Sequence, residues 1–339
     1  MRDSSIARKV YGRSLIAISA ALALSMIMIL LISDAPLTAI TLLLTGAVRS
    51  KLAFGNMLAS AARLTIAGLA AAMVFRAGLF NLGGEGQALA GGLSAAMTAM
   101  AFPNLPSLPA LGLSIMAGSI AGGLMGAISG VLKTWLKADE LISSFLLSSS
   151  MIPVGAMLLG GHLKDPESYL IAAPPLPAAY RLSLWMPPSR LGPMLVIAVL
   201  LSLAAVLFLF YTRRGYEWRL FGMNPVFAAY GGIRVGSITI LAMALSGGLF
   251  GLAGTAALLD GGQAVQGFTS GLGWNGLAVA LIARIHPGYV PLAVLAYSWL
   301  EAGTQSAIIN TGFPYTLVGL VQGAVFLLVT VGTKSRGSA

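Results

Sequence analysis

The polar side chains that could do chemistry in this chain are few, and several gather in one short stretch. Residues 75–87 read FRAGLFNLGGEGQ and place Asn81, Glu85 and Gln87 among four glycines, between two long apolar segments. A carboxylate and two amides can contact a solute or a neighbouring helix, because they form several hydrogen bonds. Glu85 also suits the N-terminus of the following helix, where the helix dipole stabilises a negative charge.

A second polar segment, GGQAVQGFTSGLGWNG, mixes glycines with amides and rings: Gln263, Gln266, Phe268, Trp274 and Asn275. Rings and amides suit a flat heterocycle, which stacks on its faces and forms hydrogen bonds at its edge. Aromatic residues near the end of a membrane span also serve as interfacial anchors. The segment therefore has two interpretations, substrate contact and membrane anchoring.

Ionisable groups inside apolar segments cost roughly 2.5 to 3.5 kcal/mol on insertion scales, which makes them functional candidates. Glu301 lies within YSWLEAGTQ, and Gln305 follows one turn later on the same face. Glu301 either lines a transport path, packs as a neutral residue or pairs with Arg63. Arg63 itself either pairs or extends toward the membrane surface. The hydroxyls of Ser143, Ser144 and Ser148–Ser150 either line a pore or bond to carbonyls of their own helix.

Catalytic residues are scarce. The chain has no cysteine, and its two histidines, His162 and His286, fall at predicted loop positions. Neither HExxH nor GxSxG occurs, so an intramembrane enzyme lacks a plausible set of residues. No GxxxxGK[ST] phosphate loop is present either. We expect no catalytic, metal or cofactor site in this chain.

The composition indicates a membrane protein. Of 339 residues, 57% are hydrophobic and 9% are charged, against about 25% charged in soluble domains. Apolar and polar residues do not alternate along the apolar runs as they would in the strands of a membrane β-barrel. The runs therefore predict helices and an all-α fold. The net charge of +10 is spread along short loops, so we expect no nucleic-acid partner.

Ten transmembrane helices are predicted in one domain, residues 1–339. They cover roughly 15–33, 56–75, 85–102, 109–133, 140–161, 191–212, 237–258, 272–285, 289–309 and 315–333. With both termini in the cytoplasm, five cations lie outside and Arg63 lies in a span, which leaves fourteen inside. The five outside are Arg49, Lys51, Lys164, Arg181 and Arg190. The positive-inside rule selects this orientation.

Three segments are assigned separately. Met1–Ser33 is either a first transmembrane helix or a signal peptide, and its length favours the helix. Residues 36–48 are apolar but short, which predicts an external interfacial or re-entrant helix. Residues 162–190 carry six prolines and should form an irregular external loop. Glycine stripes in IAGGLMGAISG and LSGGLFGLAG predict close helix packing and hint at an inverted repeat.

The largest internal loop, residues 213–236, carries the pattern of a short helix. Asn224 can cap it, Pro225 suits its first turn, and Gly231 and Gly232 suit its end. Its apolar surface would come from Phe221, Met223, Val226 and Phe227. Such a helix either docks a partner protein or lies on the inner membrane face.

Four segments together resemble a known family. GMNPVFAAYGGIRVG resembles the coupling segment of permease subunits of bacterial ABC importers for nucleosides, simple sugars and branched-chain amino acids. FRAGLFNLGGEGQ, ADELISSFLL and GWNGLAVALIAR resemble motifs of the nucleoside-type members. All four occur in the family's order between residues 75 and 285.

The resemblance implies that this chain moves a small polar solute inward by alternating access, driven by a separate cytoplasmic ATPase that binds ATP and Mg. The other implied partners are a second permease subunit, identical or homologous, and an extracytoplasmic binding protein. The implied coupling residues are Gly222, Asn224, Pro225, Ala228, Ala229, Tyr230, Gly231, Gly232 and Arg234. The candidate pathway residues are Asn81, Glu85, Gln87, Ser148, Phe268, Trp274, Asn275, Glu301 and Gln305.

Two adjacent positions depart from the family pattern. Nucleoside-type permeases have an amide and a ring where this chain has Ser148 and Ser149. The resemblance implies a nucleoside or related heterocycle as the solute, and this departure keeps a simple sugar or a riboflavin-type solute as the alternative. An ion-coupled transporter, with Glu85 or Glu301 as its ion site, is the alternative class.

Overall fold

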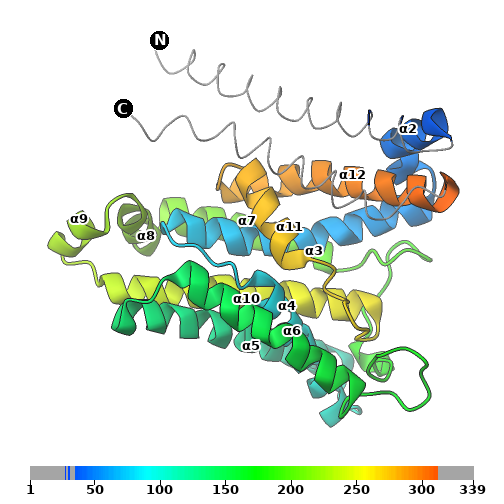
Figure 1. The fold of residues 1–339 in the computed structure, drawn as a ribbon, viewed down its shortest axis with the longest axis horizontal. Helices are drawn as coiled ribbons and strands as arrows, with labels where there is room; N and C mark the ends of the chain where they lie inside the picture. The colour runs from blue at the N-terminus through cyan, green and yellow to red at the C-terminus, as the bar shows by residue number, and fades with distance from the viewer. Residues whose placement is uncertain (1–26, 28–29, 31–34, 312–339) are drawn as a thin grey trace. The chain divides into compact units, whose positions relative to one another are not determined.

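The computed structural model describes Ile27, Leu30 and residues 35–311. In this part of the chain the regular elements are all helices (Figure 1). The α-helices are α2 (Pro36–Thr45), α3 (Lys51–Arg76), α4 (Gly84–Ala101), α5 (Ser107–Leu136), α6 (Glu140–Gly160), α7 (Met194–Tyr211), α8 (Arg213–Met223), α9 (Pro225–Tyr230), α10 (Val235–Gly261), α11 (Leu272–Ile282) and α12 (Val290–Thr311). The short 3-10 helices are η1 (Gly46–Val48), η2 (Ala178–Tyr180) and η3 (Pro287–Tyr289). The all-α prediction is confirmed.

Five helices are long and apolar enough to cross a membrane: α3, α5, α6, α7 and α10. A sixth span is possible if α11 and the helix after it, which meet at a bend of 106°, count as one. α11 alone has 11 residues, about 16 Å at 1.5 Å per residue, too short for a core of about 30 Å. The eight predicted helices within residues 35–311 all have counterparts, but ten separate spans are not established. The predicted helices 15–33 and 315–333 fall outside the described residues.

The chain divides into two compact units. The first combines residues 1–57 with 295–339, and the second comprises residues 58–294. In the first unit, Ala39, Leu42 and Leu43 of α2 form an apolar cluster with Ala307 of α12. The indole nitrogen of Trp299 donates to the carbonyl of Leu44 at 3.0 Å. Residues 36–48 are thus helical as predicted, held against α12.

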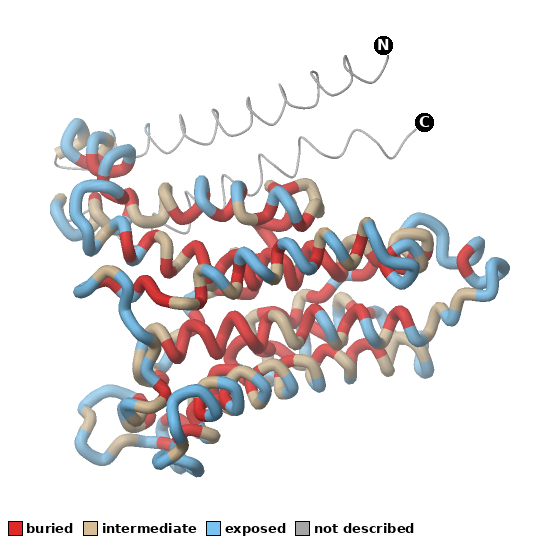
Figure 2. Tube along the Cα trace, turned by 180° about the vertical axis from the view of Figure 1, so that it is seen from behind, coloured by how far each residue is buried: buried red, intermediate tan, exposed pale blue. Residues whose placement is uncertain are grey.

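The core of the second unit is a close packing of α4, α5 and α10. Gly122 of α5 lies so near α10 that a Cβ there would overlap the carbonyl oxygen of Gly247. A Cβ at Gly91 of α4 would likewise overlap Gly251 of α10. Small residues thus let three backbones meet, as the glycine stripes predict. Figure 2 shows buried residues gathered on the helix faces that pack together.

The loop regions agree with the predictions only in part. Residues 162–190 form an irregular loop that contains η2. Tyr180 in this loop is buried, and its hydroxyl donates to the carbonyl of Phe102 at 2.8 Å. Residues 213–236 hold two helices, α8 and α9, whereas only the second was predicted. α8 was not predicted because RRGYEWR is highly charged, yet Trp218 lies on a buried face of this helix.

Candidate functional site

Two helices of the second unit begin at the same place, and Glu85 lies between their starts. Gly84 opens α4, and its added Cβ would lie 3.0 Å from the Cα of Gly273 in the first turn of α11. The Glu85 carboxylate accepts the backbone N–H groups of Gly271 at 3.2 Å and Gly273 at 2.9 Å. It also accepts the hydroxyl of Thr269 at 2.5 Å. Glu85 therefore caps α11 as well as lying in the first turn of its own helix.

A buried amide network holds the segment that leads into α4. The side-chain nitrogen of Asn81 donates to Gln87 at 2.8 Å and to the Ser246 hydroxyl of α10 at 3.0 Å. The Asn81 oxygen accepts the N–H of Gly83 at 2.9 Å. Asn81 and Gln87 are fully buried. The sequence left two roles for these amides, contact with a solute or contact with a neighbouring helix. The bond from Asn81 to Ser246 favours contact with a neighbouring helix.

Two serines of α6, one turn apart, bind the same segment. Ser144 accepts the N–H of Leu82 at 3.0 Å, and Ser148 accepts that of Gly86 at 2.7 Å. Ser144 also donates to its own helix, at Glu140, as Ser150 does at Leu146. The predicted bonds to carbonyls of the same helix thus form. The sequence did not reveal that Ser144 and Ser148 also satisfy orphan donors at the start of α4.

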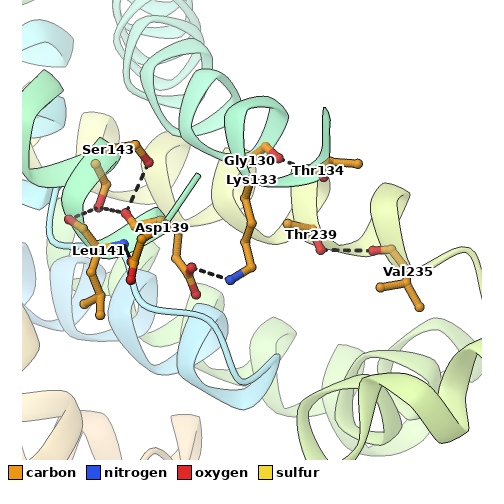
Figure 3. A network of polar contacts seen from close by, with 10 residues as sticks. Gly130, Lys133, Thr134, Asp139, Leu141, Ser143, Val235 and Thr239 are labelled. Atoms are coloured by element: carbon orange, nitrogen blue, oxygen red, sulfur yellow. Dashed lines mark hydrogen bonds and ion pairs between the residues drawn. The ribbon is translucent and has the colours of Figure 1, made fainter. Parts of the chain in front are cut away.

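Figure 3 shows what fixes the start of α6. Lys133 at the end of α5 pairs with Glu140, the first residue of α6. Asp139 caps the helix by accepting the N–H of Leu141 at 2.8 Å. The start of α10 lies beside the end of α5, because the Thr134 hydroxyl donates to the Gly236 carbonyl at 3.5 Å. Within α10 the Thr239 hydroxyl donates to the Val235 carbonyl. The α5–α6 connection therefore sets the position of the serines that bind α4.

An aromatic pair lies beside the Glu85 junction. The ring of Trp274, in the first turn of α11, is 51% exposed, and its centroid lies 6.4 Å from that of Phe145 on α6. The two rings meet edge to face. Phe268 packs over Gly92 of α4. Phe145 was not among the predicted pathway residues, because within ADELISSFLL it looked like an ordinary apolar residue.

The sequence offered Glu301 as a partner for Arg63, but the structure pairs Arg63 with another carboxylate. Arg63 of α3 pairs with Asp260 of α10 at 3.3 Å, and the Asp260 side chain is almost fully buried. This partner of Arg63 was not predicted, because the two residues lie 197 positions apart in the sequence. Glu301 and Gln305 lie in α12 within the first unit. Asn275 follows Trp274 and is half-buried.

The short helix predicted within residues 213–236 is present as α9 (Pro225–Tyr230). The Asn224 side chain accepts the N–H of Phe227 at 3.0 Å, Pro225 opens α9, and Gly232 has a φ of +79°, where a side chain would be strained. Met223, Val226, Phe227 and Tyr230 are exposed, while Ala228 is buried. The prediction that Phe221 belongs to the exposed apolar surface is wrong, because Phe221 is buried with Trp218 on one face of α8. We call Met223, Val226, Phe227 and Tyr230 the α9 surface.

Within the residues described, no group of three acidic, histidine or cysteine side chains is placed to hold a metal ion. The polar groups at the Glu85 junction serve structural hydrogen bonds. The Phe145–Trp274 pair and the α9 surface, in contrast, are exposed.

Comparison with known proteins agrees with this arrangement. Residues 53–330 match the family model described as branched-chain amino acid transport system / permease component. The probable riboflavin import permease protein RfuC of Treponema pallidum is 33% identical, over 77% of this chain and 70% of that protein. The nucleoside ABC transporter permease protein NupB of Lactococcus lactis is 30% identical, over 85% and 82%.

A third relative, the guanosine ABC transporter permease protein NupP of Bacillus subtilis, is 30% identical over 78% of this chain and 77% of its own. No solved structure matches the chain.

Proposed function

Because this chain belongs to the permease family of branched-chain amino acid transport systems, a family of multi-pass membrane subunits rather than enzymes, we propose that it moves a nucleoside-like solute inward under the control of a separate ATPase. The observation that carries this proposal is the α9 surface. A helix of six residues, capped at Asn224, presents apolar side chains outside the bundle. Figure 1 shows α9 extending beyond the end of α10. Exposed apolar groups on a rigid helix suit a docking partner.

The proposal includes the partners that the family resemblance implies. A cytoplasmic ATPase would bind ATP and Mg and receive residues 222–234. A second permease subunit and an extracytoplasmic binding protein would complete the transporter. In this proposal the chain is one permease domain with ten spans and both termini in the cytoplasm, as the loop charges favour.

The proposed solute combines a flat heterocycle with a hydroxylated ring or chain. The names of the relatives support this class, because riboflavin and guanosine share that design. The exposed ring of Trp274, next to Asn275, offers a stacking face and an amide. Glu85 accepts three donors within the protein, so an ion-coupled mechanism centred on Glu85 gains no support.

Matched tyrosine variants test the coupling role. Tyr230→Ala removes the most exposed ring of the α9 surface, and Tyr169→Ala removes a fully exposed ring from the 162–190 loop. We expect Tyr230→Ala to reduce the amount of ATPase subunit that copurifies with the tagged chain, and Tyr169→Ala to leave it unchanged. Equal recovery in both variants would contradict the docking role of α9.

A further inference from the structure

A cavity of about 430 Å³ opens beside the α9 surface in the second unit. Its walls include Arg76 at the end of α3, Tyr216, Arg219, Gly222 and Met223 of α8, and Arg284 after α11. We call it the arginine pocket. Three cationic side chains from three separate elements thus border one space.

Two of these cations share one aromatic ring. The guanidinium carbon of Arg219 lies 5.0 Å from the centroid of Phe210, and that of Arg76 lies 5.7 Å from the same centroid. The Nε of Arg76 donates to the carbonyl of Ile285 at 2.6 Å. Like charges this close repel each other, and an anion placed between them would offset the repulsion.

The pocket contains no carboxylate of its own among its described lining residues. The one acidic residue of α8, Glu217, pairs instead with Arg213 at 3.6 Å and Arg214 at 3.3 Å. The Nε of Arg219 is buried and has no hydrogen-bond partner within the described part of the chain. A buried donor without a partner is costly, so this atom indicates a missing acceptor.

The backbone that borders the pocket is strained. Arg284 and Ile285 have φ values of 52° and 58°, the left-handed region that non-glycine residues avoid. For Ile285, a β-branched residue, this conformation is especially unfavourable. Strained residues of this kind cluster at ligand clamps and switches. Here the strained turn brings the Ile285 carbonyl to Arg76 and the Arg284 residue to the pocket.

We propose that the arginine pocket receives a carboxylate side chain of the ATPase subunit. The inference rests on the proposed coupling function. Gly222 and Met223 line the pocket and directly precede Asn224, the cap of α9, so a protein seated on the α9 surface would also cover the pocket. Guanidinium groups bind carboxylates in a paired geometry, which would satisfy the free donor of Arg219 and offset the repulsion between Arg219 and Arg76.

Charge variants on one helix test the assignment. Arg219→Glu reverses a pocket charge, and Arg213→Glu makes the same change on the exposed side of α8. With the chain and ATPase coexpressed, we expect Arg219→Glu to lower the affinity for the ATPase by about tenfold or more. Arg213→Glu should bind it like the unmodified chain. Arg219→Gln, a smaller perturbation, is measured alongside in case the reversed charge prevents folding, and it should weaken binding in the same direction.

A suppressor screen names the partner residue. An acidic residue of the ATPase changed to Arg should restore binding to Arg219→Glu. If Tyr230→Ala loses the ATPase while Arg219→Glu and Arg219→Gln keep it, the pocket assignment is wrong and the coupling function stands. If none of the three variants changes recovery, the coupling function itself fails. Binding is also measured with the purified chain and ATPase in vesicles that differ only in their content of anionic lipid. If that change alone restores ATPase binding to Arg219→Gln, the pocket serves a lipid headgroup and the proposal is overturned.

Discussion

The carboxylate of Glu85 accepts the backbone N–H of Gly273 at 2.9 Å, which joins the first turn of α4 to the first turn of α11. Both helix starts lie inside the second unit, where their free N–H groups need partners. Glu85 supplies one partner for α11, and Ser148 supplies another for α4. The glycines of FRAGLFNLGGEGQ permit the close approach, and its polar residues satisfy the exposed backbone.

Replacing Glu85 with Gln separates its charge from its shape. The amide keeps one acceptor oxygen but turns an NH2 group toward the donors of Gly271 and Gly273. We expect the free energy of unfolding in detergent to fall by about 2 kcal/mol, the scale of a charge-assisted hydrogen bond. Thermal unfolding of the purified chain measures this. Glu167→Gln, in the exposed loop, is the matched control, and equal melting of the two variants would refute the capping role.

The two hydroxyls of α6 should differ in importance. Ser148→Ala leaves the buried N–H of Gly86 without an acceptor, at a cost of about 1 to 3 kcal/mol. Ser150→Ala removes only an exposed bond to its own helix and should change stability by less than about 0.5 kcal/mol. Thermal melting compares the two variants. A Ser148→Ala protein as stable as Ser150→Ala would contradict the hydrogen bond to Gly86.

The ion pair between Arg63 and Asp260 should show strong coupling. Arg63→Gln leaves the buried Asp260 carboxylate without its 3.3 Å partner, which costs about 3 kcal/mol or more. Adding Asp260→Asn removes the buried carboxylate charge that has lost its partner. The double variant should therefore regain much of the lost free energy of unfolding. Additive effects of the two single changes would show that the groups do not interact.

Replacing Trp274 should reduce solute uptake more than it reduces membrane insertion and yield. Its ring is half-exposed, so Trp274→Ala should weaken uptake of guanosine or riboflavin by about tenfold, the scale of one lost stacking contact of about 1.4 kcal/mol. Trp185→Ala, in the 162–190 loop and equally exposed, is the control for insertion and yield. Unchanged transport in Trp274→Ala would remove this residue from the pathway.

Local signals predicted much of this molecule. Long apolar runs placed eight of its helices within a few residues, and Asn224, Pro225 and Gly232 identified α9, because caps depend on neighbouring residues. The contacts between distant segments were not predictable in this way. The sequence does not show that Glu85 reaches Gly273, that Ser148 reaches Gly86 or that Arg63 meets Asp260, since each joins residues more than 60 positions apart.

The burial of Phe221 in α8 was also not predictable from the sequence. A charged stretch such as RRGYEWR looks like a solvated loop, yet one face of it packs Trp218, whose indole donates to the carbonyl of Met73 at 3.0 Å. That inward face also buries Phe221. Helix faces become visible only when the neighbouring helix is known.

Uptake into proteoliposomes that contain this chain, the second permease subunit, the proposed ATPase subunit and the binding protein tests the central claim most directly. We expect guanosine or riboflavin to accumulate only when ATP is inside with the ATPase, and a proton ionophore to leave that accumulation unchanged. Accumulation that persists without ATP and collapses when the ionophore is added would contradict an ATP-driven importer.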